Sequence, residues 1–195
     1  MTGAGPAPTR GPGTGGPRAP RVLVAGIGNV FLGDDGFGVQ VVRRIARGPV
    51  PDGVDVVDYG IRGVHLAYDL LDGRYATVVM VDAAPLDGPP GTLGVLEVDT
   101  AAPPADTAAA GVGGTTPGFD AHGLHPEAVL ALLRGLGGHI DRVLVVGCQP
   151  AALDEGMDLS EPVRASVDAA ARLVLQLARN EVAALAGAEE RRNAR

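Results

Sequence analysis

The feature that most constrains the fold is the stretch of residues 21–39, which predicts a buried strand, a tight glycine turn and a helix. Residues 22–25 are apolar without alternation, as in a strand covered on both faces. Asp34 and Asp35 fall where the helix should begin, and there free N–H groups and the helix dipole favour carboxylates. From Val39 onward the apolar residues have helical spacing.

This glycine turn is close to the fingerprint of dinucleotide-binding strands but does not match it. That motif requires Gly-x-Gly-x-x-Gly, and the last position here is Phe31. Two adjacent aspartates would also repel a pyrophosphate. A turn lined by carboxylates better suits a cation or a polar substrate. The competing interpretation is that Asp34 and Asp35 only cap the helix.

The rest of the chain alternates strands and helices, which predicts an α/β fold with a mostly parallel sheet and right-handed crossovers. Further strands are expected at residues 54–58, 77–81, 92–98 and 142–146, and further helices at residues 64–71, 126–134 and about 160–188. No crossover helix fits before residues 92–98, so we expect this strand to run antiparallel at the edge of the sheet.

The chain is long enough for one α/β domain, which we place at residues 21–188 of 195. Residues 1–20 are rich in Gly, Pro, Thr and Ala without an apolar core, which predicts a disordered arm and not a signal peptide. Residues 189–195 are expected to be a frayed tail. Residues 99–119 predict a lid, a binding segment or a disordered loop.

Composition excludes several classes of function. The net charge is −7, no basic cluster occurs and Trp is absent, which argues against nucleic-acid binding. No apolar run is long enough to span a bilayer, so no membrane contact is expected. The single Cys148 excludes an internal disulfide and fits a reducing compartment. We therefore expect a cytoplasmic protein and, from its size alone, a monomer.

Two aspartates and a histidine form the candidate site. Asp35 follows the first strand and Asp82 ends the third. In doubly wound sheets these strands are often neighbours, and ligands bind beyond their carboxyl ends. The two carboxylates should therefore meet, and His122 could join them from the loop above the same edge. Two carboxylates and an imidazole suit Zn, Ni or a similar divalent ion and leave coordination positions open.

Each of these residues also has a purely structural interpretation. Asp82 could cap the turn that follows it, and His122 could cap the next helix. His125 competes with His122 as a ligand, whereas His65 and His139 are typical of ordinary helix and turn positions. Cys148 follows a strand as some nucleophiles do. It lacks a recognisable activating partner, however, and a small buried thiol is the default interpretation.

Several short motifs resemble, in their order, the hydrogenase maturation endopeptidases of [NiFe]-hydrogenases. The resemblance covers residues 21–177 and is carried by Gly-Ile-Gly-Asn at 26–29, Asp-Asp-Gly-x-Gly at 34–38, Val-Asp-Ala at 81–83, Asp-Ala-His at 120–122, Val-Gly-Cys-Gln-Pro at 146–150 and Glu-Gly-Met-x-Leu-Ser at 155–160. It implies a three-layer α/β/α sandwich on a mixed sheet, in agreement with the five strands predicted above.

The resemblance further implies that the protein removes a C-terminal extension from the hydrogenase large-subunit precursor after nickel insertion. The family's metal ligands map onto Asp35, Asp82 and His122, and some members have Glu where Asp35 stands. The nickel would be carried by the substrate and would not be a permanent cofactor, and zinc or cadmium could occupy the same site. The metal would either polarise the scissile carbonyl or activate a water, or would serve only in recognition.

The leading hypothesis is therefore a peptidase that acts on a nickel-loaded hydrogenase precursor. The first alternative is a non-catalytic metal-binding chaperone or docking factor in hydrogenase maturation, since no protease nucleophile is recognisable. The second is a nucleotide-binding module, against which the interrupted fingerprint argues.

Overall fold

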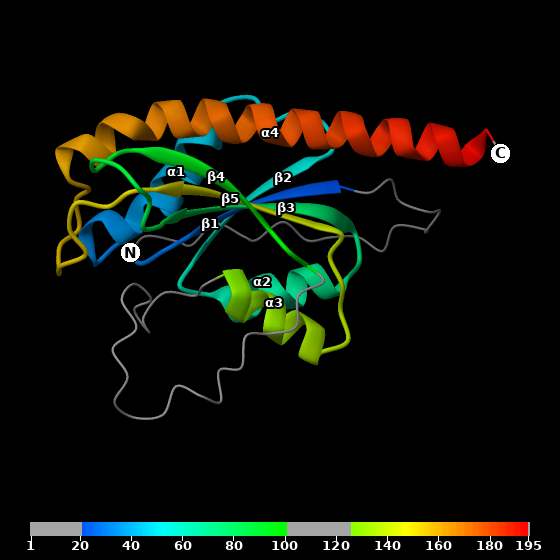
Figure 1. The fold of residues 1–195 in the computed structure, drawn as a ribbon, viewed down its shortest axis with the longest axis horizontal. Coiled ribbons are helices and arrows are strands. Elements are labelled where there is room, and N and C mark those ends of the chain that lie inside the picture. Colours follow the sequence, from blue (N-terminus) through cyan, green and yellow to red (C-terminus); the bar gives the residue numbers. More distant parts are fainter. Residues whose placement is uncertain (1–20, 101–125, 195) are drawn as a thin grey trace, which may run out of the picture.

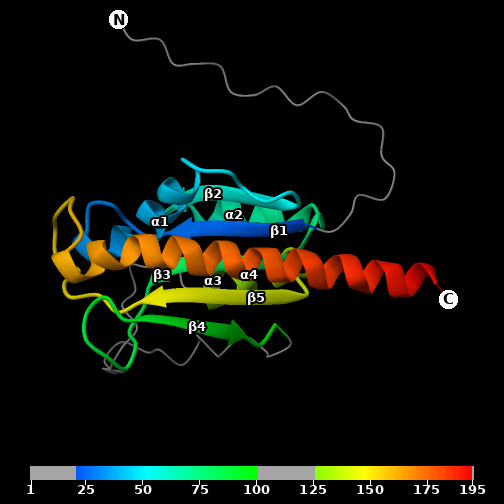
Figure 2. The same ribbon diagram turned by 90° about the horizontal axis from the view of Figure 1, so that it is seen from above.

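The computed structural model describes residues 21–100 and 126–194, whose centre is a five-stranded sheet (Figures 1 and 2). The strands lie in the order β2 (Val54–Gly60), β1 (Arg21–Ile27), β3 (Tyr75–Ala83), β5 (Arg142–Cys148) and β4 (Leu93–Val98). The first four run parallel, and β4 pairs with β5 antiparallel at the edge. The predicted adjacency of the first and third strands and the predicted antiparallel edge strand are both confirmed.

Helices cover both faces of the sheet, so the predicted three-layer α/β/α sandwich is confirmed (Figure 1). α1 (Phe37–Ile45) and α4 (Glu161–Asn193) lie on one face, and α2 (Gly63–Leu71) and α3 (Pro126–Gly135) lie on the other. Alternate residues of each central strand serve the two cores. In β3, Val79 packs with the first pair of helices and Val78 with the second, and both are fully buried. This explains why the central strands read as continuous apolar runs.

The sequence predicted that the acidic pair begins the first α-helix, and this prediction is wrong. Asp34 and Asp35 belong to a short 3-10 helix, η1 (Gly33–Gly36), and α1 begins at Phe37. Neither carboxylate accepts a hydrogen bond from the first turn of α1, where no side-chain cap bond is present. The capping interpretation of the pair is therefore wrong for α1.

The last helix is longer than predicted. α4 was expected to end near residue 188 and to fray over residues 189–195, but it continues to Asn193 and extends beyond the sheet (Figure 2). Residues 188–192 are Ala, Glu and Arg, which are strong helix formers, and two arginines in the last turn suit the negative end of the helix dipole. Ser160 occupies the predicted N-cap position, although its hydroxyl does not cap the helix.

The N-terminal arm at residues 1–20 lies outside the described residues, and so does the predicted long loop from residue 101 onward. Within the described part of the chain, no helix combines the length and the apolar character needed to cross a membrane.

Candidate functional site

Asp35 and Asp82 lie at the same edge of the sheet. Asp82 is near the carboxyl end of β3, in register with Gly147 of β5. Asp35 lies in η1, which follows β1 closely and packs against β3. Because β1 and β3 are adjacent and parallel, the segments that follow them converge at the switch point of the sheet. Two residues 47 positions apart in sequence are thus brought to one place by the topology.

The glycine turn before η1 fixes the position of Asp35. The backbone N–H of Asn29 donates a hydrogen bond of 2.5 Å to Oδ2 of Asp35. Gly28 adopts a φ of +124°, and a Cβ at this position would lie 1.8 Å from the carbonyl oxygen of Asp35. Only glycine allows this close approach, so the turn holds the Asp35 carboxylate beyond the end of β1.

The electrostatic environment of Asp82 differs from that of a surface carboxylate. Burial and, second, the negative charge of Asp35 raise the pKa of Asp82 to about 8, although a hydrogen bond from the Ala83 backbone opposes the shift. The effect of Asp35 agrees with the contact between η1 and β3, the elements that carry the two aspartates. At neutral pH the Asp82 carboxyl group therefore keeps its proton, and a bound cation would favour release of that proton.

Asp34 has a different function from its neighbour Asp35, which the sequence pattern did not reveal. Its side chain is buried, and it accepts hydrogen bonds from the backbone N–H groups of Ala151, Ala152 and Ser160 and from the Ser160 hydroxyl at 2.7–3.1 Å. Burial alone would raise the pKa of Asp34, but these bonds outweigh burial and hold the pKa below its ordinary value. Asp34 thus fastens η1 to the loop between β5 and α4.

Gln149 organises the chain that follows Asp82, and sequence reasoning assigned it no function. Its Oε1 accepts a hydrogen bond of 2.5 Å from the backbone N–H of Leu86. Its backbone N–H donates to the carbonyl of Thr92 at 2.8 Å, and its own carbonyl accepts from Gly91 at 2.9 Å. The Val-Gly-Cys-Gln-Pro motif could have indicated this function of Gln149, because a polar residue directly after a buried strand is placed to bind the neighbouring loop.

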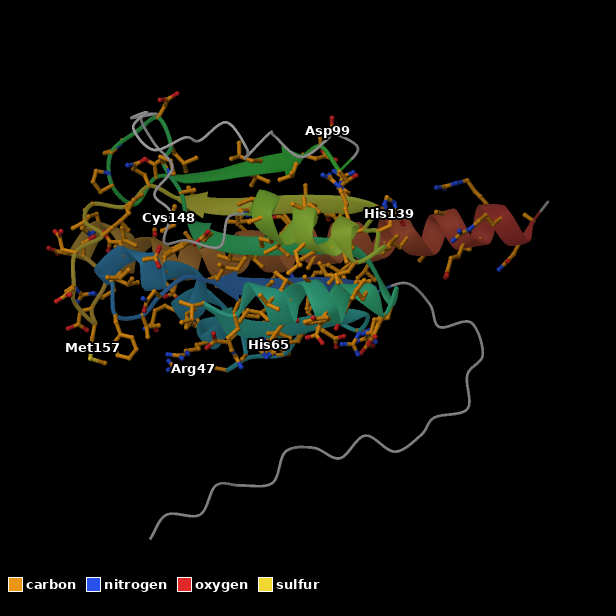
Figure 3. All side chains as sticks on the ribbon, turned by 90° about the horizontal axis from the view of Figure 1, so that it is seen from below. Arg47, His65, Asp99, His139, Cys148 and Met157 are labelled. Atoms are coloured by element: carbon orange, nitrogen blue, oxygen red, sulfur yellow. The ribbon has the colours of Figure 1, made fainter. Side chains whose placement is uncertain are left out.

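The structure does not describe the histidine that was predicted as the third residue of the site. His122 and His125 lie outside the described residues. His65 lies in α2, and His139 pairs at 3.2 Å with Asp141 in an exposed turn, which are the ordinary helix and turn positions expected of them (Figure 3). Among the described residues, no group of three His, Cys, Asp or Glu side chains could hold a metal ion. The part of His122 in the site therefore stays a prediction.

Cys148 is a core residue. Its side chain is fully buried in the core between the sheet and α4, and its Sγ lies 3.4 Å from the Ser166 hydroxyl (Figure 3). Burial raises the pKa of the Cys148 thiol, which keeps it protonated and unreactive at neutral pH.

We expect Cys148→Ala to keep the full activity of the wild-type protein. The change removes one buried sulfur and should lower the free energy of unfolding by about 1 kcal/mol, the usual size for a small core truncation. Activity measured at 25 °C beside a thermal melt separates the two effects. A folded but inactive variant would instead identify Cys148 as a nucleophile.

Comparison with known proteins gives a consistent result. The profile of a family described as hydrogenase maturation protease matches residues 39–177. The hydrogenase expression/formation protein HoxM of Azotobacter vinelandii is 34% identical over 160 residues, which are 81% of this chain and 72% of HoxM. The crystal structure of a hydrogenase 2 maturation peptidase from Thaumarchaeota archaeon SCGC_AB-539-E09 is 35% identical, with a TM-score of 0.60 over 80% of this chain and 97% of that one. The hydrogenase maturating endopeptidase HybD from E. coli, 23% identical, shares the fold, with a TM-score of 0.61 over 83% of this chain and 93% of that one.

Proposed function

The chain belongs to the hydrogenase maturation protease family, and from this premise we propose that it is an endopeptidase that removes the C-terminal extension of a [NiFe]-hydrogenase large-subunit precursor after nickel insertion. In this proposal the substrate's nickel is the signal that insertion is complete. Asp35, Asp82 and His122 engage that nickel. The proposal extends the family assignment to one substrate and one order of events.

The observation that carries the proposal is the coupled pair of carboxyl groups at the carboxyl edge. Asp35 is held by the Asn29 N–H and the Gly28 turn, and Asp82 is held by β3. Their mutual repulsion and the burial of Asp82 make this edge unfavourable for two negative charges. A divalent cation brought by another molecule would relieve that repulsion, which favours binding of a loaded substrate over an empty one.

The donor set fits a metal that is shared with another protein. Two carboxylates, or two carboxylates with the His122 imidazole, do not complete the coordination shell of nickel or zinc. The remaining positions are then available to ligands of the precursor. A metal engaged at this edge can polarise a nearby peptide carbonyl or lower the pKa of a bound water, which would favour hydrolysis there. Within the chain, Gln149 and Asp34 keep the flanking loops in place around the pair.

The intact mass of a nickel-loaded precursor tests whether the protein is a peptidase. We expect incubation with the protein to reduce the precursor's mass by that of its C-terminal segment, and to release this segment as a peptide. A stable complex with a precursor of unchanged mass would contradict the proposal and favour a non-catalytic chaperone. Precursor incubated without the protein is the control for adventitious proteolysis.

A further inference from the structure

Exposed apolar side chains gather beside the carboxylate pair. Met157, 71% exposed, is the most exposed large hydrophobic residue in the described part of the chain, and Phe31 and Leu153 are 61% and 46% exposed. Phe31 lies in the turn between β1 and η1, and the other two lie in the loop of residues 151–158 between β5 and α4. This loop is at the end of the sheet where β1, β3 and β5 finish (Figure 2).

Backbone hydrogen bonds join the turn that carries Phe31 to the loop of residues 151–158. The exposure of these apolar side chains therefore does not reflect a loose loop. The N–H of Gly156 donates to the carbonyl of Phe31 at 2.9 Å, and the N–H of Gly33 donates to the carbonyl of Gly156 at 2.8 Å. The buried Asp34 carboxylate binds both ends of the same loop. A rigid surface loses little conformational entropy when a partner binds, which favours recognition.

Acidic side chains accompany the apolar ones. Every residue from 151 to 158 is exposed, and Asp154, Glu155 and Asp158 contribute three negative charges without a basic residue in the loop. Within the described residues none of the three forms an ion pair, whereas Arg44 nearby is already paired with Asp168 at 2.6 Å. The loop therefore complements a partner that presents Arg or Lys side chains next to apolar ones.

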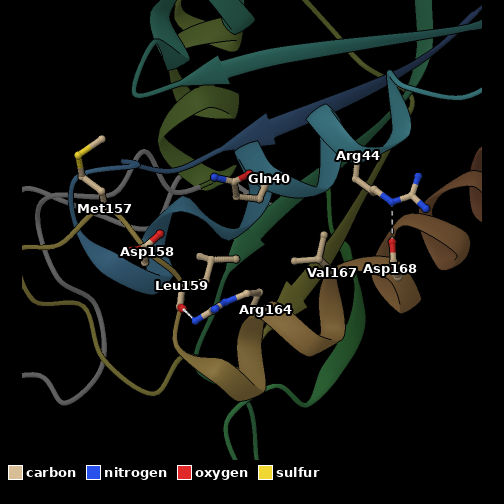
Figure 4. A pocket seen from close by; sticks show the side chains of 8 residues that line it. All are labelled: Gln40, Arg44, Met157, Asp158, Leu159, Arg164, Val167 and Asp168. Carbon is tan, nitrogen blue, oxygen red and sulfur yellow. Dashed lines mark hydrogen bonds and ion pairs between the residues drawn. The ribbon is translucent and has the colours of Figure 1, made fainter.

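A pocket lies next to the loop of residues 151–158. It has a volume of ≈ 390 Å³, with Met157 and Asp158 on the loop side and Gln40 of α1 and Val167 of α4 among its other walls (Figure 4). Interfaces draw most of their binding energy from a few side chains that fill such depressions. The pocket provides a place for one large side chain of the partner.

We propose that Phe31, Leu153, Asp154, Glu155, Met157 and Asp158 form a docking surface for a basic and apolar segment of the hydrogenase large-subunit precursor. This inference rests on the proposed function, because a precursor whose C-terminal segment reaches Asp35 must contact the surface around η1. The docking surface binds the body of the precursor independently of nickel. Asp34 links the docking surface to the adjacent Asp35.

Binding of the nickel-free precursor tests the docking surface separately from cleavage, since the proposed function leaves this precursor uncut. We expect Phe31→Ser with Met157→Ser to raise the dissociation constant roughly tenfold, as loss of interface anchors does. Glu155→Arg should weaken binding and reduce its dependence on salt. Melting temperatures should stay at the wild-type value, because these side chains are exposed.

Matched controls lie at the opposite edge of the sheet. Leu136→Ser changes an apolar residue after α3 that is 42% exposed, and Asp72→Arg reverses an exposed charge after α2. Both variants should bind like the wild type.

Equal dissociation constants for the docking variants and the wild type would overturn the inference, and so would absence of binding by the wild type. A change in the sedimentation of the variants alone would also overturn it, because the surface would then join two copies of this chain. Failure of the wild type to cut nickel-loaded precursor while binding persists would refute only the proposed function.

Discussion

Asp82→Asn and Asp35→Asn are each expected to lower precursor processing by at least about 100-fold while the protein stays folded. Loss of groups that only support metal ligands already costs 10–100-fold in metal affinity or activity, so loss of a ligand should cost more. Asn cannot supply an anionic oxygen to the substrate's metal. For Asp82 the fold should tolerate the change well, because an amide resembles the protonated carboxyl group that burial and Asp35 favour.

The measurement is the initial rate of cleavage on a gel, beside a thermal melt of each variant. Asp72→Asn, an exposed aspartate at the other edge of the sheet, is the matched control and should process precursor normally. The opposite pattern would contradict the account. Active variants with a lower melting temperature would mean that these carboxylates serve only to bind nearby backbone N–H groups, a structural role worth about 0.5–2 kcal/mol. The same assay on His122→Ala tests the third predicted ligand.

Gly38→Ala is expected to destabilise the protein by about 3 kcal/mol and to disrupt the site. A Cβ at Gly38 would lie 2.0 Å from the carbonyl oxygen of Val81 and 2.3 Å from that of Ile27. Both obstacles are backbone atoms at the ends of β3 and β1, so α1 would have to move away from the sheet. Overpacking of this kind usually costs about 1–3 kcal/mol, and a backbone clash belongs at the upper end. η1, which carries Asp35, precedes α1 directly and would move with it.

Chemical denaturation with urea measures this loss. Gly135→Ala at the end of α3 is the matched control, because nothing lies within 4 Å of the added methyl group. It should be neutral or stabilising by about 0.5–1 kcal/mol. Equal stability of the two variants would show that the contact between α1 and the strand ends is looser than the structure has it.

The arrangement of strands could be predicted because it depends on local pattern and chain length. The unbroken apolar runs identified the parallel strands, and the short connection to β4 required an antiparallel pair. The switch-point rule then predicts that Asp35 and Asp82 lie at one edge of the sheet. The same reasoning misplaced the start of α1, since a 3-10 turn and an α-helical turn have nearly the same apolar spacing.

The functions of Asp34 and Gln149 could not be read from sequence, because their partners are distant or irregular. Asp34 binds backbone groups 117 to 126 positions away, and no periodicity predicts such a contact. Gln149 binds loop residues whose conformation no regular pattern sets. The end of α4 was misjudged because a charged terminus was expected to fray, whereas its Ala, Glu and Arg residues favour a helix.

The most direct test of the account compares cleavage of two preparations of one precursor, one loaded with nickel and one free of it. We predict that the wild-type protein shortens the loaded precursor and leaves the nickel-free precursor at full length over the same time. Adding nickel to the empty precursor under conditions that restore its insertion should then restore cleavage. Cleavage of nickel-free precursor at the rate of the loaded one would contradict recognition of the substrate's metal by Asp35 and Asp82.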